Sequence, residues 1–188
     1  MKKVSRSPLV IWDWNGTLVD DAFIFVDIMN GFLSSYGLKQ ISLDDYRAAF
    51  CFPVHNYWSS LGFRLSQKEF RVLSVEFIRK YKKKMFKPPL KADILTVLEY
   101  LDKKNYLQLI VSAQEQSLLN SSVDYYNIKK YFSGVFGLKN NFAESKSALA
   151  LSSLGSFVTK QSSLVVIGDT EHDLEVARLI KADCCLVS

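Results

Sequence analysis

Residues 9–20 read Leu-Val-Ile-Trp-Asp-Trp-Asn-Gly-Thr-Leu-Val-Asp, and this stretch organises the rest of the chain. Its first four residues form a short apolar run, which is typical of a buried strand in a parallel sheet. The run stops at Asp13, so a carboxylate stands at the carboxyl end of the strand, where open α/β sheets bind ligands. Gly16 permits a sharp turn, and Thr17 adds a hydroxyl. The pattern suits a carboxylate nucleophile that is also a metal ligand, although Asp also occurs in ordinary turns after strands.

The composition is that of a globular protein with a modest basic excess. The 188 residues are 48% hydrophobic and 23% charged, with a net charge of +5. That length suffices for one good core, or for a core with a small inserted module. The sequence has no basic stripe interleaved with aromatic residues, no zinc-finger spacing and no helix-turn-helix pattern, so we expect no nucleic-acid partner. The basic run at residues 79–84 is expected to be the exposed end of a helix.

The cysteines and the apolar runs indicate the compartment. Cys51, Cys184 and Cys185 form neither a disulfide framework nor a CxxC pair, and the last two are expected to be buried in a terminal strand. No segment approaches the ~20 consecutive apolar residues that a membrane span requires, and Asp13 interrupts the only early apolar run. We therefore expect a cytoplasmic protein that does not associate with membranes.

Two different patterns divide the chain. Between residues 20 and 87 the apolar spacing predicts only helices, over 20–36, 42–50, 56–61 and 66–86, with a loop at 51–54 because Pro53 interrupts the helical pattern. From Leu90 onward helices alternate with strands, which are expected at 106–111, 134–137, 164–167 and 184–187. This alternation predicts an α/β fold with a parallel, doubly wound sheet. Residues 1–19 and 88–188 would form its core, and residues 20–87 an all-helical insertion.

Three further groups follow or flank predicted strands. Ser112 follows the strand at 106–111, where its hydroxyl can hold an anionic oxygen. Lys146 begins a predicted helix, an unfavourable place for a cation unless an anion lies nearby. Asp169 ends the buried strand at 164–167, and Asp173 lies four residues later. Asp173 also completes a capping box with Thr170, which offers a purely structural explanation for it.

The two carboxylates at Asp169 and Asp173 suit a magnesium ion. Mg²⁺ takes one or two protein carboxylates, keeps several waters and accepts a substrate phosphate oxygen. The two histidines are less informative. We expect His172 to be exposed to solvent, and His55, in the helical insertion, to be the better candidate for contacting substrate.

The chain resembles the haloacid dehalogenase-like hydrolase superfamily. The resemblance lies in four groups of residues and in their order along the chain: Asp13 with Gly16-Thr17, then Ser112, then Lys146, and last Gly168-Asp169-Thr170 with Asp173. All four sequence motifs of that superfamily appear at ordinary spacing. The resemblance implies a Rossmann-like parallel sheet of strand order 5-4-1-2-3. It also implies that the helical insertion is a type-1 cap, whose Phe52-Pro53-Val54 loop resembles that of phosphoglycolate phosphatase-like members.

The resemblance also implies roles for single residues. Asp13 would attack phosphorus and form an aspartyl-phosphate, which water then hydrolyses. Thr17 and Ser112 would bind the transferring phosphoryl group, and Lys146 would offset its charge. Mg²⁺ would be held by Asp13, the backbone carbonyl of Asn15, Asp169 and Asp173. The residues expected to contact a small phosphorylated metabolite are Trp14, Gly16, Ala113 and His55.

The chain departs from the superfamily pattern at Asn15, where phosphatases carry a second Asp that protonates the leaving group and then activates water. An amide cannot act as a general acid, and such assistance is typically worth ~10²–10⁴ in rate. The first hypothesis is a magnesium-dependent phosphatase of small phosphomonoesters, slowed by Asn15. The second is a regulatory protein that binds a phosphorylated ligand without useful turnover. The third is a phosphonatase-type hydrolase, for which Lys39 is the only early candidate for a Schiff base.

Overall fold

The computed structural model describes residues 8–139, 146–154, 157 and 163–187. Its strands are β1 (Leu9–Trp12), β2 (Leu107–Glu115), β3 (Gly134–Leu138), β4 (Leu164–Gly168) and β5 (Asp183–Leu186). Its helices are α1 (Ala22–Ser35), α2 (Leu43–Ala49), α3 (Val54–Ser60), α4 (Gln67–Lys82), α5 (Ile94–Lys103), α6 (Gln116–Tyr125), the 3₁₀ turn η1 (Lys129–Tyr131), α7 (Lys146–Leu154) and α8 (Glu171–Ile180). Among these helices, none is both long enough and apolar enough to cross a membrane.

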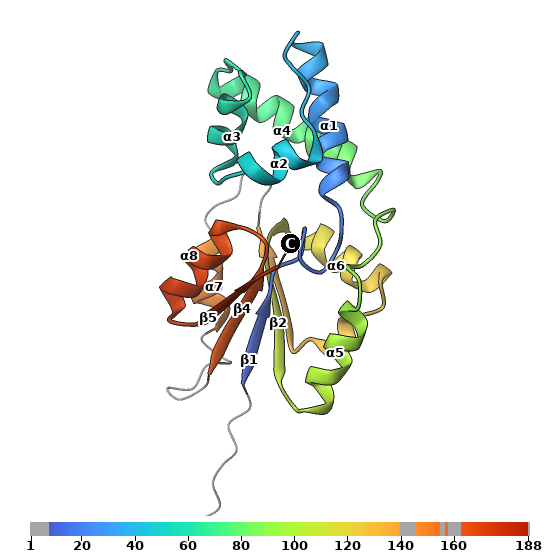
Figure 1. Ribbon diagram of the computed structural model, residues 1–188, viewed down its shortest axis with the longest axis vertical. Coiled ribbons are helices and arrows are strands. Elements are labelled where there is room, and N and C mark those ends of the chain that lie inside the picture. Colours follow the sequence, from blue (N-terminus) through green and yellow to red (C-terminus); the bar gives the residue numbers. More distant parts are fainter. Residues whose placement is uncertain (1–7, 140–145, 155–156, 158–162, 188) are drawn as a thin grey trace, which may run out of the picture.

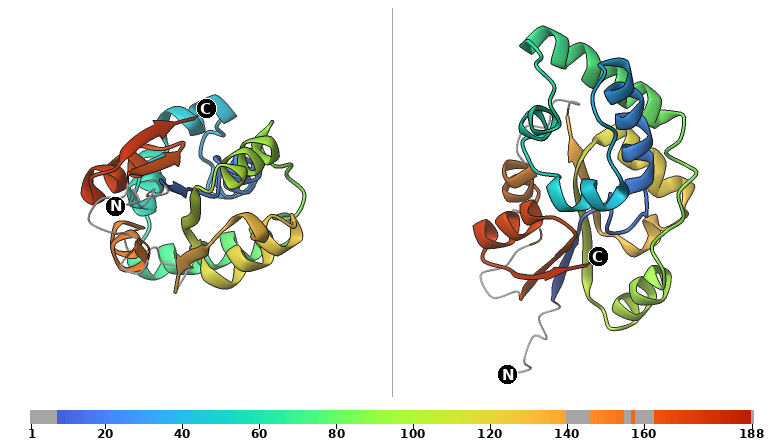
Figure 2. Two further views of the ribbon diagram at one scale, coloured as in Figure 1. Left: turned by 90° about the horizontal axis from the view of Figure 1, so that it is seen from below. Right: turned by 45° about the horizontal axis from the view of Figure 1, so that its top comes forward.

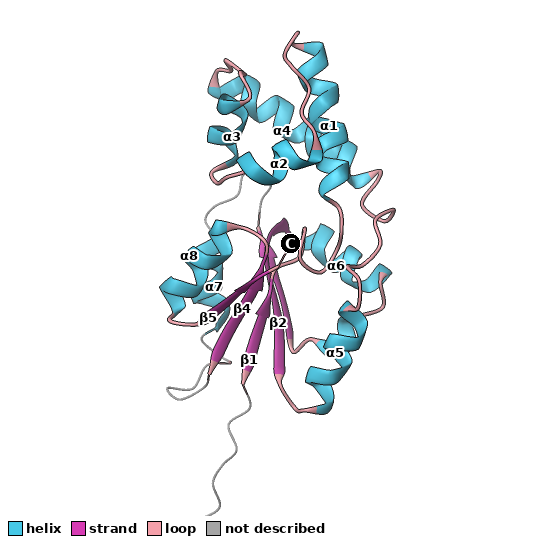
Figure 3. Ribbon diagram, in the orientation of Figure 1, coloured by secondary structure: helices cyan, strands magenta, loops and turns pink. Residues whose placement is uncertain are grey.

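The five strands form one parallel sheet in the order β3-β2-β1-β4-β5 (Figure 1). Central strand β1 pairs in register with both neighbours, so that Leu9 lies beside Leu107 of β2 and Leu164 of β4. The arrows in Figure 3 all point the same way, which brings the carboxyl ends of the strands to one edge of the sheet. The prediction of an α/β, Rossmann-like sheet of order 5-4-1-2-3 is confirmed.

Side chains of the central strands alternate between two hydrophobic layers. Val10, Trp12 and Ile110 pack against α5 and α6 on one face, whereas Leu9 and Ile11 pack against α7 and α8 on the other. The view from below in Figure 2 shows these two helix layers on opposite sides of the sheet. Both faces are therefore covered, which explains why β1 and β4 consist of apolar residues and glycine alone.

Helices α1 to α4 lie beyond the carboxyl ends of the strands (Figure 1), and their apolar side chains form a separate hydrophobic cluster that also includes Leu118 of α6. All four fall within residues 20–87, and the chain leaves and re-enters the sheet region through adjacent segments. Val19 forms an isolated antiparallel bridge with Leu90, and the Asp20 amide donates to the Pro89 carbonyl at 3.0 Å. The division of the chain into core and cap at residues 19/20 and 87/88 stays a prediction.

Strand β2 is longer than expected. We predicted that it ends at Val111 with Ser112 in the following loop, but the strand continues to Glu115. Its pairing with β3 shifts register between Val111 and Glu115, so the polar residues there belong to an irregular extension of the strand. Such bulges re-aim side chains beside active sites. Ser112 accordingly lies within β2.

Two other local predictions are wrong. Val54 was placed in a loop, but Pro53 takes the N-cap position and α3 begins directly after it, because proline is compatible with a helix start. Cys184 and Cys185 were expected to be buried, yet Cys185 is exposed and Cys184 is half-buried. Their strand β5 lies at the edge of the sheet, where helices cover it less completely.

Candidate active site

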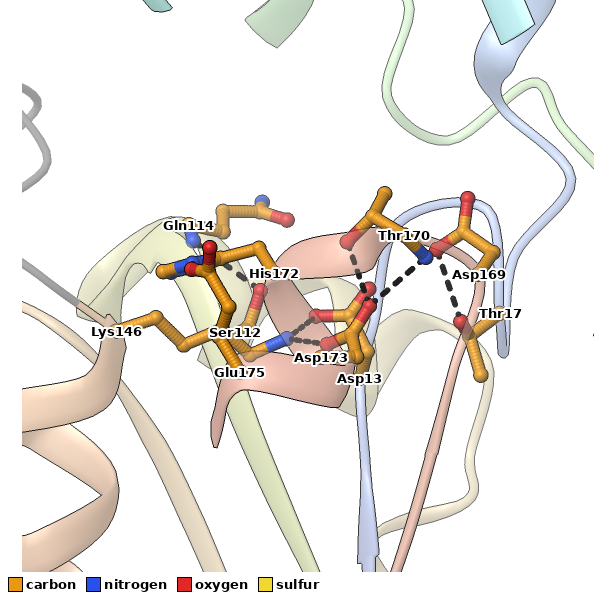
Figure 4. A network of polar contacts seen from close by, with 10 residues as sticks. All are labelled: Asp13, Thr17, Ser112, Gln114, Lys146, Asp169, Thr170, His172, Asp173 and Glu175. Atoms are coloured by element: carbon orange, nitrogen blue, oxygen red, sulfur yellow. Dashed lines mark hydrogen bonds and ion pairs between the residues drawn. The ribbon is translucent and has the colours of Figure 1, made fainter. Parts of the chain in front are cut away.

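The polar residues of interest gather at the carboxyl edge of the sheet (Figure 4). Asp13 directly follows β1, Ser112 lies near the end of β2, and Asp169 directly follows β4. Asp173 comes from the first turn of α8, and Lys146 is the first residue of α7. Parallel strands meet at this edge, so residues more than 100 positions apart in sequence lie together.

Two glycines allow the carboxylates to converge. Gly16 has a φ of +79°, and a Cβ atom there would lie 2.1 Å from Oδ2 of Asp169. A Cβ at Gly168 would lie 2.1 Å from Cγ of Asp173. Both backbone segments therefore approach a carboxylate more closely than any other residue type permits. Asp13, Asp169 and Asp173 each bring a carboxylate oxygen within 4.8 Å of the others.

Lys146 links two of these carboxylates. Its ammonium group donates to Oδ1 of Asp13 and to Oδ1 of Asp173, and its side chain is only 5% exposed. Burial opposes the charged form of Lys146, but Asp13 and Asp173 outweigh it and raise the pKa of the amine. The α7 cation therefore neutralises carboxylates from β1 and α8, which accounts for its place at a helix N-terminus.

The carboxylates respond differently to their surroundings. Burial raises the pKa of Asp13 to about 8 against the opposing charge of Lys146, and burial followed by the charge of Asp173 raises the pKa of Asp169. Burial also acts to raise the pKa of Asp173, but Lys146 and the hydrogen bonds from Thr170 lower it overall. A bound cation would favour the ionised forms of Asp13 and Asp169.

The donor set fits a hard divalent cation. Asp173 uses Oδ1 on Lys146, while its Oδ2 accepts from the Thr170 amide at 3.1 Å and the Thr170 hydroxyl at 2.7 Å. In the contacts made by the described residues, Asp13 and Asp169 each engage one oxygen and leave the other for a ligand. Two carboxylates together with waters are a typical magnesium donor set. Both oxygens of Asp173 are thus engaged within the protein, one by Lys146 and the other by Thr170.

The two predicted phosphoryl-binding hydroxyls make contacts within the site. Thr17 is buried, and its hydroxyl donates to Oδ1 of Asp169 at 3.1 Å. This contact orients a candidate metal ligand. Ser112 is also buried, and its Oγ accepts from the backbone N–H of Gln114 at 3.1 Å. Its own hydrogen is thus available to an anionic oxygen.

The predicted substrate-contacting side chains are dispersed. The Trp14 ring is buried in the core, 5.9 Å from that of Tyr126, so that a ligand contact from this residue would come from its backbone. Ala113 is half-buried beside Ser112 in β2. His55 is exposed on α3, where its ring meets Phe70 of α4 at 5.2 Å. This contact keeps His55 within the group of helices α1 to α4, which we call the helical layer.

His172 is not exposed as predicted. Its side chain is 12% exposed, and its ring lies 4.7 Å from the ring of Phe52, with Nδ1 3.0 Å from Glu175. Phe52 belongs to the loop before α3, so the helical layer contacts α8 one residue away from Asp173. Sequence periodicity within α8 could not reveal a ring supplied by another part of the chain.

Asn15 is held by two residues that the sequence analysis missed. Its Nδ2 donates to Oδ2 of Asp21 at 2.5 Å and to the Tyr81 hydroxyl at 3.0 Å. The Tyr81 hydroxyl donates in turn to Oδ2 of Asp21 at 2.7 Å, and the Gly16 amide donates to Oδ1 at 3.2 Å. Burial raises the pKa of Asp21 to about 6 against these hydrogen bonds. In the sequence, Asp21 is indistinguishable from an ordinary acidic helix start.

Two further polar side chains face this region. The side-chain amide of Gln114 lies beside the site in Figure 4. Its nitrogen and its oxygen are both buried and have no hydrogen-bond partner among the described residues. Tyr46 comes from α2, and burial followed by the charge of Asp21 raises the pKa of its phenol well above the usual value. Asp13 and Asp169 contribute to that rise, which places Tyr46 within electrostatic reach of the carboxylates.

Comparisons with known proteins agree with this geometry. The sequence profile of the family described as haloacid dehalogenase-like hydrolase matches residues 10–187. No curated protein matches the sequence. Among solved structures, the haloacid dehalogenase-like hydrolase SP0104 from Streptococcus pneumoniae is 20% identical with a TM-score of 0.81, over 97% of this chain and 85% of that one.

Other solved structures show that the fold is shared by proteins of different described activity. A predicted phosphoglycolate phosphatase from Haemophilus somnus is 19% identical with a TM-score of 0.74, covering 98% of this chain and 86% of its own. Protein tyrosine kinase A from Mycobacterium tuberculosis is also 19% identical, with a TM-score of 0.81, covering 98% and 85%. At this identity the likeness establishes the fold, and the reaction has to be argued from the site.

Proposed function

The chain belongs to the haloacid dehalogenase-like hydrolase family, and from this premise we propose that it is a magnesium-dependent phosphatase of a small phosphomonoester. The observation that carries the proposal is the convergence of Asp13, Asp169 and Asp173 at the carboxyl edge of the sheet, where Lys146 contacts Asp13 and Asp173. A nucleophilic carboxylate, a hard-cation donor set and a buried ammonium group are the parts that phosphoryl transfer requires.

In this proposal an oxygen of Asp13 attacks phosphorus, and the bond from phosphorus to the leaving oxygen breaks with its electron pair on that oxygen. Water then attacks the aspartyl-phosphate, the bond to Asp13 breaks, and inorganic phosphate leaves. Lys146 offsets the charge of Asp13 and of the transferring group, while the Ser112 hydroxyl donates to a phosphoryl oxygen. These contributions are positioning and electrostatic stabilisation, which dominate enzymatic phosphoryl transfer.

Asp13 and Asp169 would hold the magnesium ion together with the backbone carbonyl of Asn15. When bound, the ion supplies charge neutralisation for the phosphoryl oxygens. Thr17 keeps Asp169 oriented, and Thr170 keeps Asp173 oriented. Such outer contacts tune the ligands that they hold.

The proposal is tested by phosphate release in the presence of Mg²⁺ from an aryl phosphate, phosphoglycolate and sugar phosphates. Asp13→Asn keeps the size of the side chain but removes the nucleophile, so we expect release to fall to the background rate. Asp102→Asn makes the same chemical change on the exposed surface of α5 and should retain wild-type release. Equal rates in wild type and Asp13→Asn would contradict the assignment.

Asn15 favours a second candidate, a protein that binds a phosphorylated ligand without turnover. Its amide occupies the position from which phosphatases of this superfamily supply a proton. This candidate predicts that a phosphorylated ligand raises the melting temperature in the presence of Mg²⁺ while no phosphate is released. Measuring both quantities on the same panel separates the two functions. For the phosphonatase-type alternative, the candidate Lys39 is exposed in the loop that follows α1.

A further inference from the structure

The amide of Asn15 can no longer donate a hydrogen bond to a ligand. An Asn side chain has two N–H hydrogens and one carbonyl oxygen. One hydrogen is directed to Asp21 and the other to the Tyr81 hydroxyl. The Tyr81 hydroxyl donates its own hydrogen to Asp21. In the side chains of Asn15, Tyr81 and Asp21 every donor therefore has an acceptor. In the contacts of the described residues, the carbonyl oxygen is the part of the Asn15 amide that is left for a ligand, and it can only accept.

This arrangement requires an amide at residue 15. Asp21 is almost fully buried, and its two oxygens already accept from Asn15, Tyr81 and the Gly16 amide. A carboxylate at residue 15 would face the Asp21 carboxylate at hydrogen-bond distance without a donor between them. Two buried like charges in contact are strongly unfavourable. In this pair the carboxylate therefore belongs to Asp21, and residue 15 carries the amide.

We propose that the protein acts on phosphoryl compounds whose leaving group departs as a stable anion, namely aryl or acyl phosphates. This inference rests on the proposed phosphatase function and specifies its leaving group. An aryl phosphate is a phosphomonoester, whereas an acyl phosphate is a mixed anhydride and would extend the function beyond esters. When Asp13 attacks phosphorus, the leaving oxygen takes the electron pair of the broken bond and departs as a phenolate or a carboxylate. Neither anion needs a proton from residue 15. An alkoxide would need one, and the Asn15 carbonyl oxygen cannot supply it.

The neighbouring phenols do not replace the missing acid. Burial and the nearby charge of Asp21 raise the pKa of Tyr46 and of Tyr81 well above the usual value. A phenol with a raised pKa is a poorer proton donor, and Tyr81 already donates to Asp21. The Asn15 oxygen can accept a hydrogen bond from the water that attacks the aspartyl-phosphate. In that step the leaving group is the carboxylate of Asp13, again a stable anion.

The test measures kcat/KM for aryl phosphates with graded phenol acidity, for a simple alkyl phosphate and for acetyl phosphate. In wild type, log(kcat/KM) should fall steeply as the pKa of the leaving group rises, with negligible release from the alkyl phosphate. The exchange variant Asn15→Asp/Asp21→Asn keeps one acid and one amide in the pair but returns the acid to residue 15. Its slope should be shallow, and its alkyl rate relative to its aryl rate should rise by roughly 10²–10⁴.

The outcomes separate this inference from the proposed function. If Asp13→Asn abolishes release but wild type shows a flat slope, the phosphatase stands and the inference fails. If no compound is turned over, acetyl phosphate included, both fail. Preference for acetyl phosphate over the most reactive aryl phosphate identifies the substrate as an acyl phosphate, and the reverse identifies an aryl phosphate.

Two single variants test for a hidden acid. Tyr46→Phe and Asp21→Asn should keep the steep slope of wild type, whatever their effect on the absolute rate. A steeper slope in either variant would mean that the removed group protonates the leaving oxygen, and this would overturn the inference. Asn15→Asp alone should lower the melting temperature more than the exchange variant does, because only the single variant brings two carboxylates together.

Discussion

Gly16 shows how a single residue without a side chain defines this site. The loop after β1 passes so close to Asp169 that even a methyl group would overlap its carboxylate. The same residue carries the positive φ that reverses the chain, so two independent requirements coincide. The interaction between the Asp13 loop and the β4 carboxylate therefore depends on the backbone of residue 16.

Gly16→Ala should consequently reduce phosphate release by roughly 100-fold or more, the size of loss that a displacement of about 1 Å at a reacting centre produces. Gly37→Ala is the matched control. Its φ of +65° imposes a similar backbone cost of about 1–2 kcal/mol, but nothing lies within 4 Å of the added Cβ. In urea unfolding we expect Gly37→Ala to show the backbone cost alone and Gly16→Ala that cost plus the displacement of Asp169, and we expect only Gly16→Ala to lose activity. Equal activities would show that Asp169 moves aside without consequence.

At the scale of the elements, Lys146 is where three of them meet. Helix α7 delivers the ammonium group, the loop after β1 delivers Asp13, and α8 delivers Asp173. The helix contacts α8 and the strands through apolar side chains such as Ala150 and Leu154, which fixes the position of its first residue. The charge pairing thus depends on helix packing on one face of the sheet.

Lys146→Ala should lower the unfolding free energy by about 3–5 kcal/mol at neutral pH, because it leaves buried carboxylates without their cation. Mg²⁺ should restore part of this loss by supplying positive charge to the same carboxylates. Lys103→Ala is the control, since Lys103 forms an exposed i,i+4 pair with Glu99 at 3.8 Å, and such pairs contribute about 0.3–0.5 kcal/mol. Urea unfolding with and without Mg²⁺ measures both. Similar losses in the two variants would contradict the buried contacts of Lys146.

At the scale of the whole molecule, two of the contacts between the helical layer and the sheet region lie beside the site. Tyr81 near the end of α4 contacts Asn15 and Asp21, and the ring of Phe52 before α3 lies against that of His172 of α8. The two contacts come from different segments of the layer. Because both end beside candidate catalytic or metal-binding residues, the position of the layer and the geometry of the site are coupled.

Asp21 makes this coupling measurable through pH. Its pKa rises from 3.8 to about 6 on folding, so between these values the folded state binds more protons than the unfolded state. Stability therefore falls as pH rises from about 4 to about 6, by roughly 3 kcal/mol for a shift of about two units. Asp21→Asn should remove this part of the decrease. Urea unfolding at several pH values in a chelator checks it, and identical pH profiles for the two proteins would contradict the burial of an ionisable Asp21.

The sequence alone determined the fold and the order of the motifs. Four apolar residues before Asp13, the alternation of helices and strands after Leu90, and the Gly168-Asp169 pair at the end of β4 are local patterns. Each pattern reflects the secondary structure and burial of one short segment. The parallel topology of the sheet then brings the carboxyl ends of the strands together. The same patterns failed where local rules compete, as at the irregular extension of β2 and at the edge strand β5.

Only the tertiary structure decided what surrounds Asn15. Tyr81 is 66 positions away from it, and Asp21 looks in sequence like the start of a helix. Whether Asn15 meets a donor, an acceptor or a charge depends on how α1 and α4 pack above the sheet, and helix periodicity does not encode that contact. The physical reason is range: hydrophobic pattern and turn chemistry act over a few residues, whereas the pairing of buried polar groups is set by the packing of distant elements.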